Sequence, residues 1–225
     1  IEKILSLKTN TFITINNEDF NYAKNNLFKK VPTYKINGVG LDLKKKNSKT
    51  IIRKKNGITK IIVIAVYKKS KGYVDLLKIA ELLKKQNFKI DCYGYGDYEK
   101  FKSIKIKKRL DNISFNKFDI NLKKKIKNYD ILLHLSKREG LPLAVMECLA
   151  EGIPVICNKI RGNNDLIKDG FNGFFVNSYK DVPNKIFYLN LEKEIFNKMR
   201  YNAFNSITKD FSKKRIDQIV YKIIK

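Results

Sequence analysis

The 225-residue chain is poor in the side chains that metal sites and disulfides use. It contains one histidine, and its three cysteines are odd in number, far apart and set in apolar surroundings (Cys92, Cys148 and Cys157). This pattern predicts reduced thiols in a cytosolic protein rather than a disulfide framework. With a single histidine available, we expect no metal site.

Long apolar runs are also missing. No stretch approaches the roughly 20 apolar residues that cross a bilayer. Residues 1–6 lack the apolar core of a signal peptide. We therefore expect a cytoplasmic protein, which could at most contact the inner face of the membrane peripherally.

Acidic residues are few, 22 against 48 Lys and Arg, which leaves a formal net charge of +26. The lysines are scattered along the whole chain together with an excess of Ile, Asn, Tyr and Phe, a pattern that suits an AT-rich coding bias as well as a selected basic face. Arginine, the usual reader of bases, is scarce, and no nucleic-acid recognition motif is present. We expect no specific nucleic-acid partner, but an attraction towards anionic substrates and anionic lipid headgroups.

Apolar runs alternate with helical patterns from residue 61 onward. The continuous run 61–66 is typical of a buried parallel strand, and a helical pattern follows over 72–83. Further segments are predicted as strands (88–93, 113–115, 131–135, 155–157 and 173–176) and as a helix (120–129). This alternation predicts an α/β fold with a Rossmann-like, doubly wound parallel sheet. Ligands of such sheets bind beyond the carboxyl ends of the strands, where five candidate residues fall: Lys71, Gly94, Lys117, Glu139 and Arg161.

Two glutamates flank a Gly-Leu-Pro turn at the start of a very apolar helix. Glu139 stands in the turn, and Glu147 follows eight positions later in a helix predicted over 143–150. A carboxylate in a buried helix needs hydrogen-bond donors, and sugar hydroxyls would serve. The free amides of the first helical turn form an anion site suited to a diphosphate. Taken alone, either glutamate could equally be a solvated charge.

The forty residues from Ser136 to Phe175 contain three sequence blocks: SKREGLPLAVMECLAEGIPV, IRGNNDLI and DGFNGFF. Both glutamates lie in the first block. They resemble the donor-binding signature of retaining glycosyltransferases of the GT-B fold, family four (group 1). REGLP together with IRGNNDLI resembles the bacterial subgroup that builds capsule and exopolysaccharide repeat units. The resemblance implies transfer of a sugar from a nucleotide diphosphate, expected to be UDP, to a lipid-linked or growing glycan. It also implies a retained anomeric configuration, no metal and no cofactor, since the nucleotide sugar is the donor substrate.

The resemblance assigns roles residue by residue. Glu139 would hold a donor-sugar hydroxyl, and Lys71 would neutralise the departing diphosphate, so these two are the catalytic candidates. Glu147 would bind the ribose hydroxyls. The remaining donor-binding candidates are the backbone of the turn (Gly140, Leu141, Pro142 and Leu143), the residues near the base (Lys117 and Phe118) and Gly94 at the end of a strand.

At three neighbouring positions the sequence leaves alternative roles open. Many members of the family carry an arginine where this chain has Val66, and Lys68 or Lys69 would have to compensate for its phosphate contact. His134 lies in a strand beside the site, where a packed or hydrogen-bonded structural histidine is favoured over a proton shuttle. Arg161 could reach a phosphate or merely cap the loop.

The resemblance also divides the chain. Residues 1–43 resemble the last strand–helix–strand of an N-terminal acceptor-binding domain, 44–58 a basic linker, 59–205 the C-terminal nucleotide-sugar domain, and 206–225 a C-terminal helix. We therefore expect an N-terminally truncated fragment. The tail helix could cross back to the N-terminal segment or pack on its own sheet.

Other functional interpretations stay open. The fragment could bind nucleotide without activity, or act as a basic nucleic-acid-binding module. A GT-B epimerase or phosphorylase relative is the enzymatic alternative, although the distinctive lysine setting of a phosphorylase is not evident.

Overall fold

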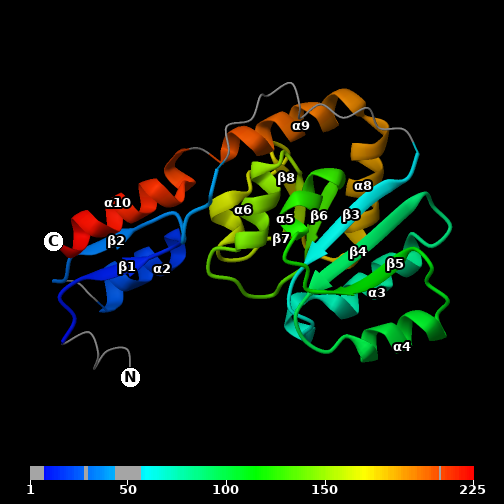
Figure 1. Ribbon diagram of the computed structural model, residues 1–225, viewed down its shortest axis with the longest axis horizontal. Coiled ribbons are helices and arrows are strands. Elements are labelled where there is room, and N and C mark those ends of the chain that lie inside the picture. The colour runs from blue at the N-terminus through cyan, green and yellow to red at the C-terminus, as the bar shows by residue number, and fades with distance from the viewer. Residues whose placement is uncertain (1–7, 28–29, 44–56, 208) are drawn as a thin grey trace.

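The computed structural model describes residues 8–27, 30–43, 57–207 and 209–225. Figure 1 shows a large α/β unit beside a small unit built from β1, α2, β2 and the C-terminal helix α10. Most of the predicted linker, 44–58, lies outside the described residues, so the predicted domain limits remain predictions. No helix in the described part of the chain is long and apolar enough to cross a membrane.

Six parallel strands form the sheet of the large unit, in the order β5-β4-β3-β6-β7-β8. Their bounds are Thr59–Ile64 (β3), Phe88–Gly94 (β4), Ile113–Lys117 (β5), Ile131–His134 (β6), Val155–Asn158 (β7) and Gly173–Val176 (β8). The central strand β6 is buried along its whole length, which explains why its sequence is a continuous apolar run. The predicted doubly wound parallel sheet is confirmed. The strand order reverses between β3 and β6, the point at which such sheets bind ligands.

Helices cover both faces of this sheet. They are α3 (Tyr73–Leu82), α4 (Glu99–Lys107), α5 (Leu122–Lys125), α6 (Leu143–Ala150), α7 (Asn163–Leu166), α8 (Val182–Leu191) and α9 (Lys193–Ser206). Side chains of α3, α4, α8 and the first half of α9 fill the core on one face. Those of α5, α6 and the end of α9 fill the core on the other. The helix predicted over 120–129 is shorter than expected, because α5 passes into a 3₁₀ turn at Ile126–Asn128.

The small unit contains the parallel strands β1 (Phe12–Thr14) and β2 (Thr33–Lys35), joined by α2 (Asn17–Tyr22) and a π-helical turn. The tail helix α10 (Lys213–Ile224) lies beside it (Figure 1). Leu41 accepts a hydrogen bond from the Lys213 amide at 2.9 Å and donates one to Phe211 O at 2.7 Å. A Cβ at Gly40 would lie 2.5 Å from Lys213 Cα, so only glycine permits this approach. Of the two placements left open, the tail adopts the one that crosses back to the N-terminal segment.

Candidate active site

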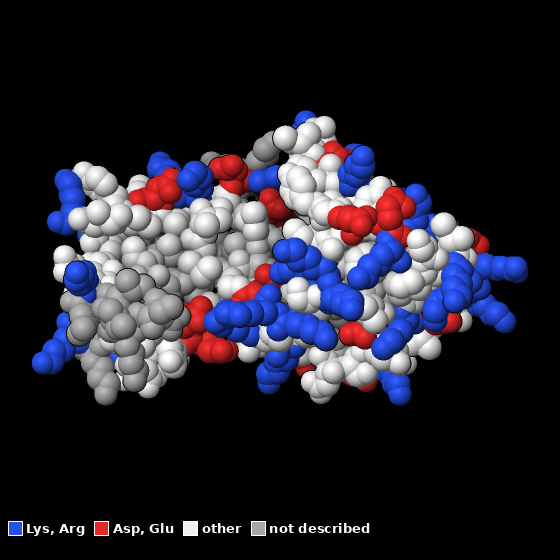
Figure 2. All heavy atoms as spheres, turned by 90° about the horizontal axis from the view of Figure 1, so that it is seen from below, with Lys and Arg blue, Asp and Glu red and all other residues white. Residues whose placement is uncertain are grey.

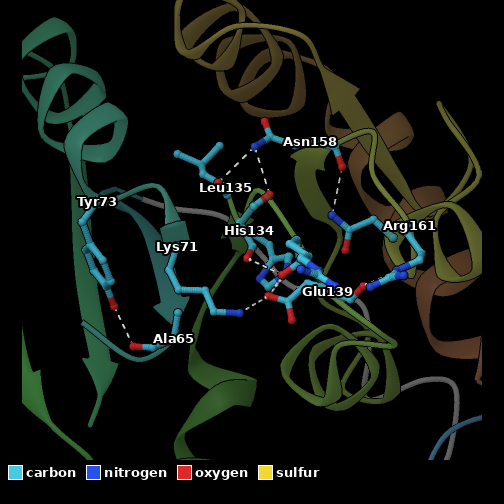
Figure 3. A network of polar contacts seen from close by, with 11 residues as sticks. Ala65, Lys71, Tyr73, His134, Leu135, Glu139, Asn158 and Arg161 are labelled. Atoms are coloured by element: carbon cyan, nitrogen blue, oxygen red, sulfur yellow. Dashed lines mark hydrogen bonds and ion pairs between the residues drawn. The ribbon is translucent and has the colours of Figure 1, made fainter. Parts of the chain in front are cut away.

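Glu139, Lys71 and His134 meet beyond the carboxyl ends of β3 and β6 (Figure 3). Lys71 Nζ donates to Glu139 Oε1 at 2.6 Å. His134 Nε2 lies 3.4 Å from the same oxygen, without the alignment of a hydrogen bond. The two predicted catalytic residues are therefore in direct contact, and His134 packs beside them.

The Glu139 carboxyl is held in its charged form. Burial alone would raise its pKa, but the imidazole of His134, the ammonium of Lys71 and the hydroxyl of Ser136 together lower the pKa to about 2. At neutral pH the group is thus an ionised hydrogen-bond acceptor. It can hold sugar hydroxyls, but it has no proton to give to a leaving group.

Close backbone packing brings Lys71 to this position. Lys71 ends a short 3₁₀ turn, and Gly72 follows with φ +82° at the start of α3. A Cβ at Gly72 would lie 2.4 Å from the carbonyl oxygen of Leu135, so a side chain there would push α3 away from the end of β6. The buried Tyr73 then donates its hydroxyl to Ala65 O at 2.7 Å, which ties α3 to the loop after β3 (Figure 3).

The first turn of α6 presents free amide groups at the same edge of the sheet. The helix begins after Pro142, which has no capping side chain, and its first turn has no acidic residue. Its amides and helix dipole therefore favour an anion. The predicted donor contacts of Gly140 to Leu143 stay predictions. Figure 2 shows basic side chains gathered over the large unit with acidic ones between them, and the net charge of +26 gives the protein as a whole a positive potential.

Glu147 lies on α6 with its side chain 24% exposed, and its nearest cation is Lys123 Nζ at 4.0 Å. Burial raises the pKa of its carboxyl, and Lys123 offsets this only in part. A half-buried carboxylate with so distant a cation would gain from hydroxyl donors. The predicted contact of Glu147 with the ribose stays a prediction.

An exposed aromatic pair stands at the far end of the edge. Phe118, after β5, stacks on Tyr95, after β4, with ring centroids 4.2 Å apart and planes inclined by 14°. At Gly94 a Cβ would lie 1.9 Å from Ala65 O, so only glycine lets the end of β4 pack this closely on the loop after β3. Lys117 is exposed beside the pair. Three strand spacings separate β5 from β6, roughly 14 Å, so an extended ligand could reach from the aromatic pair to Glu139.

Sequence reasoning missed Tyr95 as a site residue, although its place directly after a strand-ending glycine was a usable signal.

The positions whose roles the sequence left open can now be located. Val66 is exposed, and so are Lys68 and Lys69, which would have to compensate for the missing arginine. Arg161 donates from Nε to the backbone oxygen of Glu139 at 3.0 Å. Arg161 therefore caps the loop that carries Glu139, and capping was one of its two predicted roles.

A known protein family matches most of the chain. Residues 44–206 match the family described as glycosyl transferases group 1. The chain belongs to this family. The resemblance inferred from the glutamate turn is thereby confirmed, and with it the GT-B type of fold.

Two curated relatives are similar over part of their length. "Putative glycosyltransferase EpsD" of Bacillus subtilis is 30% identical over 189 residues, which cover 78% of this chain and 50% of EpsD. UDP-Gal:alpha-D-GlcNAc-diphosphoundecaprenol alpha-1,3-galactosyltransferase of Escherichia coli is 32% identical over 127 residues, 49% of this chain and 33% of that protein. The chain thus spans half or less of the length of these two relatives.

Solved structures share the fold at low sequence identity. The pneumococcal O-GlcNAc transferase GtfA, in complex with UDP and GlcNAc, superimposes with a TM-score of 0.80 at 22% identity, covering 98% of this chain and 46% of GtfA. Anabaena Alr3699/HepE, in complex with UDP and glucose, gives 0.80 at 16% identity, with 96% and 63% covered.

Proposed function

We propose that this chain is the donor-binding part of a retaining glycosyltransferase that takes a sugar from a nucleoside diphosphate, UDP being the expected nucleotide. The ion pair between Lys71 and Glu139, beside the uncapped start of α6, is the observation that carries the proposal. One relative is named for a UDP-galactose donor, and two structural neighbours are complexes with UDP.

The phosphate and sugar roles follow from charge. A diphosphate seated at the first turn of α6 attracts Lys71, so Lys71 exchanges its contact with Glu139 for one with phosphate oxygens. Glu139, still ionised, is then free to accept hydrogen bonds from sugar hydroxyls. Charge developing on the leaving diphosphate is met by preorganised amides and one ammonium group. In this proposal Glu139 binds the sugar and does not attack it, and the reaction requires neither metal nor cofactor.

The nucleoside roles use the other end of the edge. The Phe118–Tyr95 stack provides an aromatic face for the base, and Lys117 lies beside it. Glu147, half-buried on α6, accepts from the ribose hydroxyls. Lys68 or Lys69 takes over the second phosphate contact that Val66 cannot make.

The acceptor is proposed from the relatives and from surface charge. The E. coli relative acts on a diphosphoundecaprenol-linked sugar, and another relative is an uncharacterised protein of a Klebsiella pneumoniae cps region. We therefore infer a lipid-linked or growing glycan of a capsule or exopolysaccharide as acceptor. The net charge of +26 would favour peripheral contact with the anionic inner face of the membrane, from the cytoplasm.

A binding and transfer experiment tests the proposal. The purified chain is titrated by calorimetry with UDP and with a single-stranded oligonucleotide at low and high salt, and incubated with radiolabelled UDP-sugars and a membrane extract. We expect UDP binding at both salt concentrations and no detectable sugar transfer, because the chain spans half or less of the two curated relatives described above. Oligonucleotide binding with steep salt dependence and no UDP binding would favour the basic nucleic-acid module instead.

A further inference from the structure

The backbone of the glutamate turn (residues 138–142) is held by side chains that lie far from it in the sequence. Arg161, in the loop after β7, donates from two nitrogens of its guanidinium. Nε donates to the carbonyl oxygen of Glu139 at 3.0 Å, and Nη1 donates to Asp19 Oδ1 on α2 at 2.7 Å. A single side chain thus connects the small N-terminal unit to the residue that carries the site carboxylate, and Figure 3 shows its contact with Glu139.

A second contact from the small unit reaches the next residue of the turn. Asn16 is fully buried, and its Nδ2 donates to Gly140 O at 3.1 Å and to Asp19 Oδ2 at 2.8 Å. Its Oδ1 accepts from the Asp19 amide at 2.8 Å, so the same side chain caps α2. All polar atoms of the Asn16 amide are therefore committed to holding α2 and the turn together.

Steric contacts leave the turn little freedom to move. Gly162 has φ +80°, and a Cβ there would lie 2.3 Å from Gly140 O, so the loop of Arg161 packs directly on the turn. A Cβ at Gly140 would lie 3.1 Å from Ile15 Cδ1, in the small unit. The turn is thus in close contact with both the loop after β7 and the small unit.

We propose that Asn16, Asp19 and Arg161 form a turn latch, a set of positioning residues that fixes Glu139 relative to Lys71 and makes the sugar end of the donor site depend on the small N-terminal unit. The assignment of a donor sugar to Glu139 rests on the proposed function. The mechanical part of the inference, that the latch sets the Glu139–Lys71 contact, does not.

Asp19 is the residue on which the latch converges. Its two oxygens serve different donors, Oδ1 for Arg161 and Oδ2 for Asn16. An asparagine has one acceptor oxygen, so it can satisfy one of these donors but turns an amide NH₂ towards the other. Alanine satisfies neither, and it leaves a buried amide and a guanidinium without their common acceptor. The Lys71–Glu139 contact at 2.6 Å should loosen in the same order.

The first test reads the Glu139 carboxyl directly. Carbon-13 NMR of the 225-residue chain follows protonation of the Glu139 carboxyl, whose signal is assigned from its loss in Glu139→Gln. The titration is compared between wild type and the variants Asp19→Asn, Asp19→Ala and Arg161→Lys. Wild-type Glu139, with a pKa lowered to about 2, should stay ionised at about pH 4, where an ordinary glutamate is roughly half protonated. We expect Asp19→Ala and Arg161→Lys to shift protonation towards the ordinary range, and Asp19→Asn to shift it less.

The matched control is Asp217→Asn, the same chemical change in an exposed ion pair with Lys213 on α10. It should leave the Glu139 titration as in wild type. A folded Asp19→Ala variant, verified by thermal unfolding, with an unchanged Glu139 titration would overturn the latch. If Asp19→Ala unfolds, Asp19→Asn and Arg161→Lys decide by the same criterion.

The second test separates the latch from the donor assignment. It measures by calorimetry the affinity of Asp19→Ala for UDP and for a UDP-sugar. We expect the affinity for UDP to change by less than about twofold and the affinity for the UDP-sugar to fall roughly three- to tenfold, because only the sugar contacts the displaced carboxylate. Equal losses for both ligands would contradict a role at the sugar end. A shifted Glu139 titration in a protein that binds neither ligand would support the latch and refute the proposed function.

Discussion

The two ends of the proposed donor site are built in different ways. At the Glu139 end, the charged groups touch one another in a partly buried setting, and glycine contacts such as that of Gly72 with Leu135 fix the backbones that carry them. At the Phe118 end, the stacked rings are 45% and 60% exposed. The comparison suggests that the phosphate and sugar groups meet a preorganised site, whereas the base meets an open surface. Substitutions at the first end should therefore disturb the fold or the charge balance, and those at the second only affinity.

The largest expected effect is that of Gly72→Ala. The new Cβ would meet Leu135 O at 2.4 Å, and φ +82° strains any residue other than glycine. We expect a loss of about 3 kcal/mol or more in the free energy of unfolding. Urea denaturation measures it, with Gly170→Ala as control, since that position also has positive φ but nothing within 4 Å. Equal losses in both variants would mean that the close approach to β6 contributes nothing.

The Glu139 carboxyl should make stability depend on pH. Its pKa is lowered in the folded state from 4.5 to about 2, so its contribution is present above pH 4.5 and is lost as the pH falls towards 2. We expect wild type to exceed Glu139→Gln by about 2 kcal/mol near neutral pH, with the difference shrinking below about pH 4.5. Urea denaturation across this range checks the prediction, and a pH-independent difference would contradict it.

Phe118→Ala probes the open end. Loss of a stacking face should weaken UDP and uridine alike, by about 1 to 2 kcal/mol, with little change in unfolding free energy. Calorimetry with both ligands gives the result, and Phe171→Ala, another exposed phenylalanine, is the control. A loss confined to UDP would place Phe118 near the phosphates rather than the base.

Glu147→Gln should have the smallest effect, a loss of slightly more than 1 kcal/mol in UDP binding in a folded protein. The neutral amide keeps the shape of the side chain but loses the charge-assisted hydrogen bonds to ribose hydroxyls. Titration with UDP and with its 2′-deoxy analogue would check it. Unchanged affinity would remove Glu147 from the ribose contact.

The sequence predicted the parts of the fold that local pattern determines. Buried strands such as β3 and β6 are continuous apolar runs, and the helix α6 is bracketed by Pro142 and Gly152. The helices α4, α8 and α9 were not predicted. In α4 only Phe101 is buried among lysines, so the apolar face that marks a helix is nearly absent. α8 had a usable signal, the capping box of Ser178 just before it.

The site was predicted from the family resemblance, but its connections were not. Asp19 and Arg161 are 142 positions apart, and nothing in the local pattern of either predicts their contact. The same holds for Asn16 and Gly140, 124 positions apart. Long-range polar contacts depend on the packing of two separate units, which periodicity and turn signals do not encode.

The most direct test of the account is the binding of UDP and uridine to wild type and to Lys71→Ala. The two ligands differ by the diphosphate, which is the group that Lys71 is proposed to meet, and Lys78→Ala, an exposed lysine on α3, serves as control. The account predicts that Lys71→Ala weakens UDP by about 1.5 to 3 kcal/mol while uridine changes little. Equal losses for both ligands, or unchanged UDP binding in a folded variant, would contradict it.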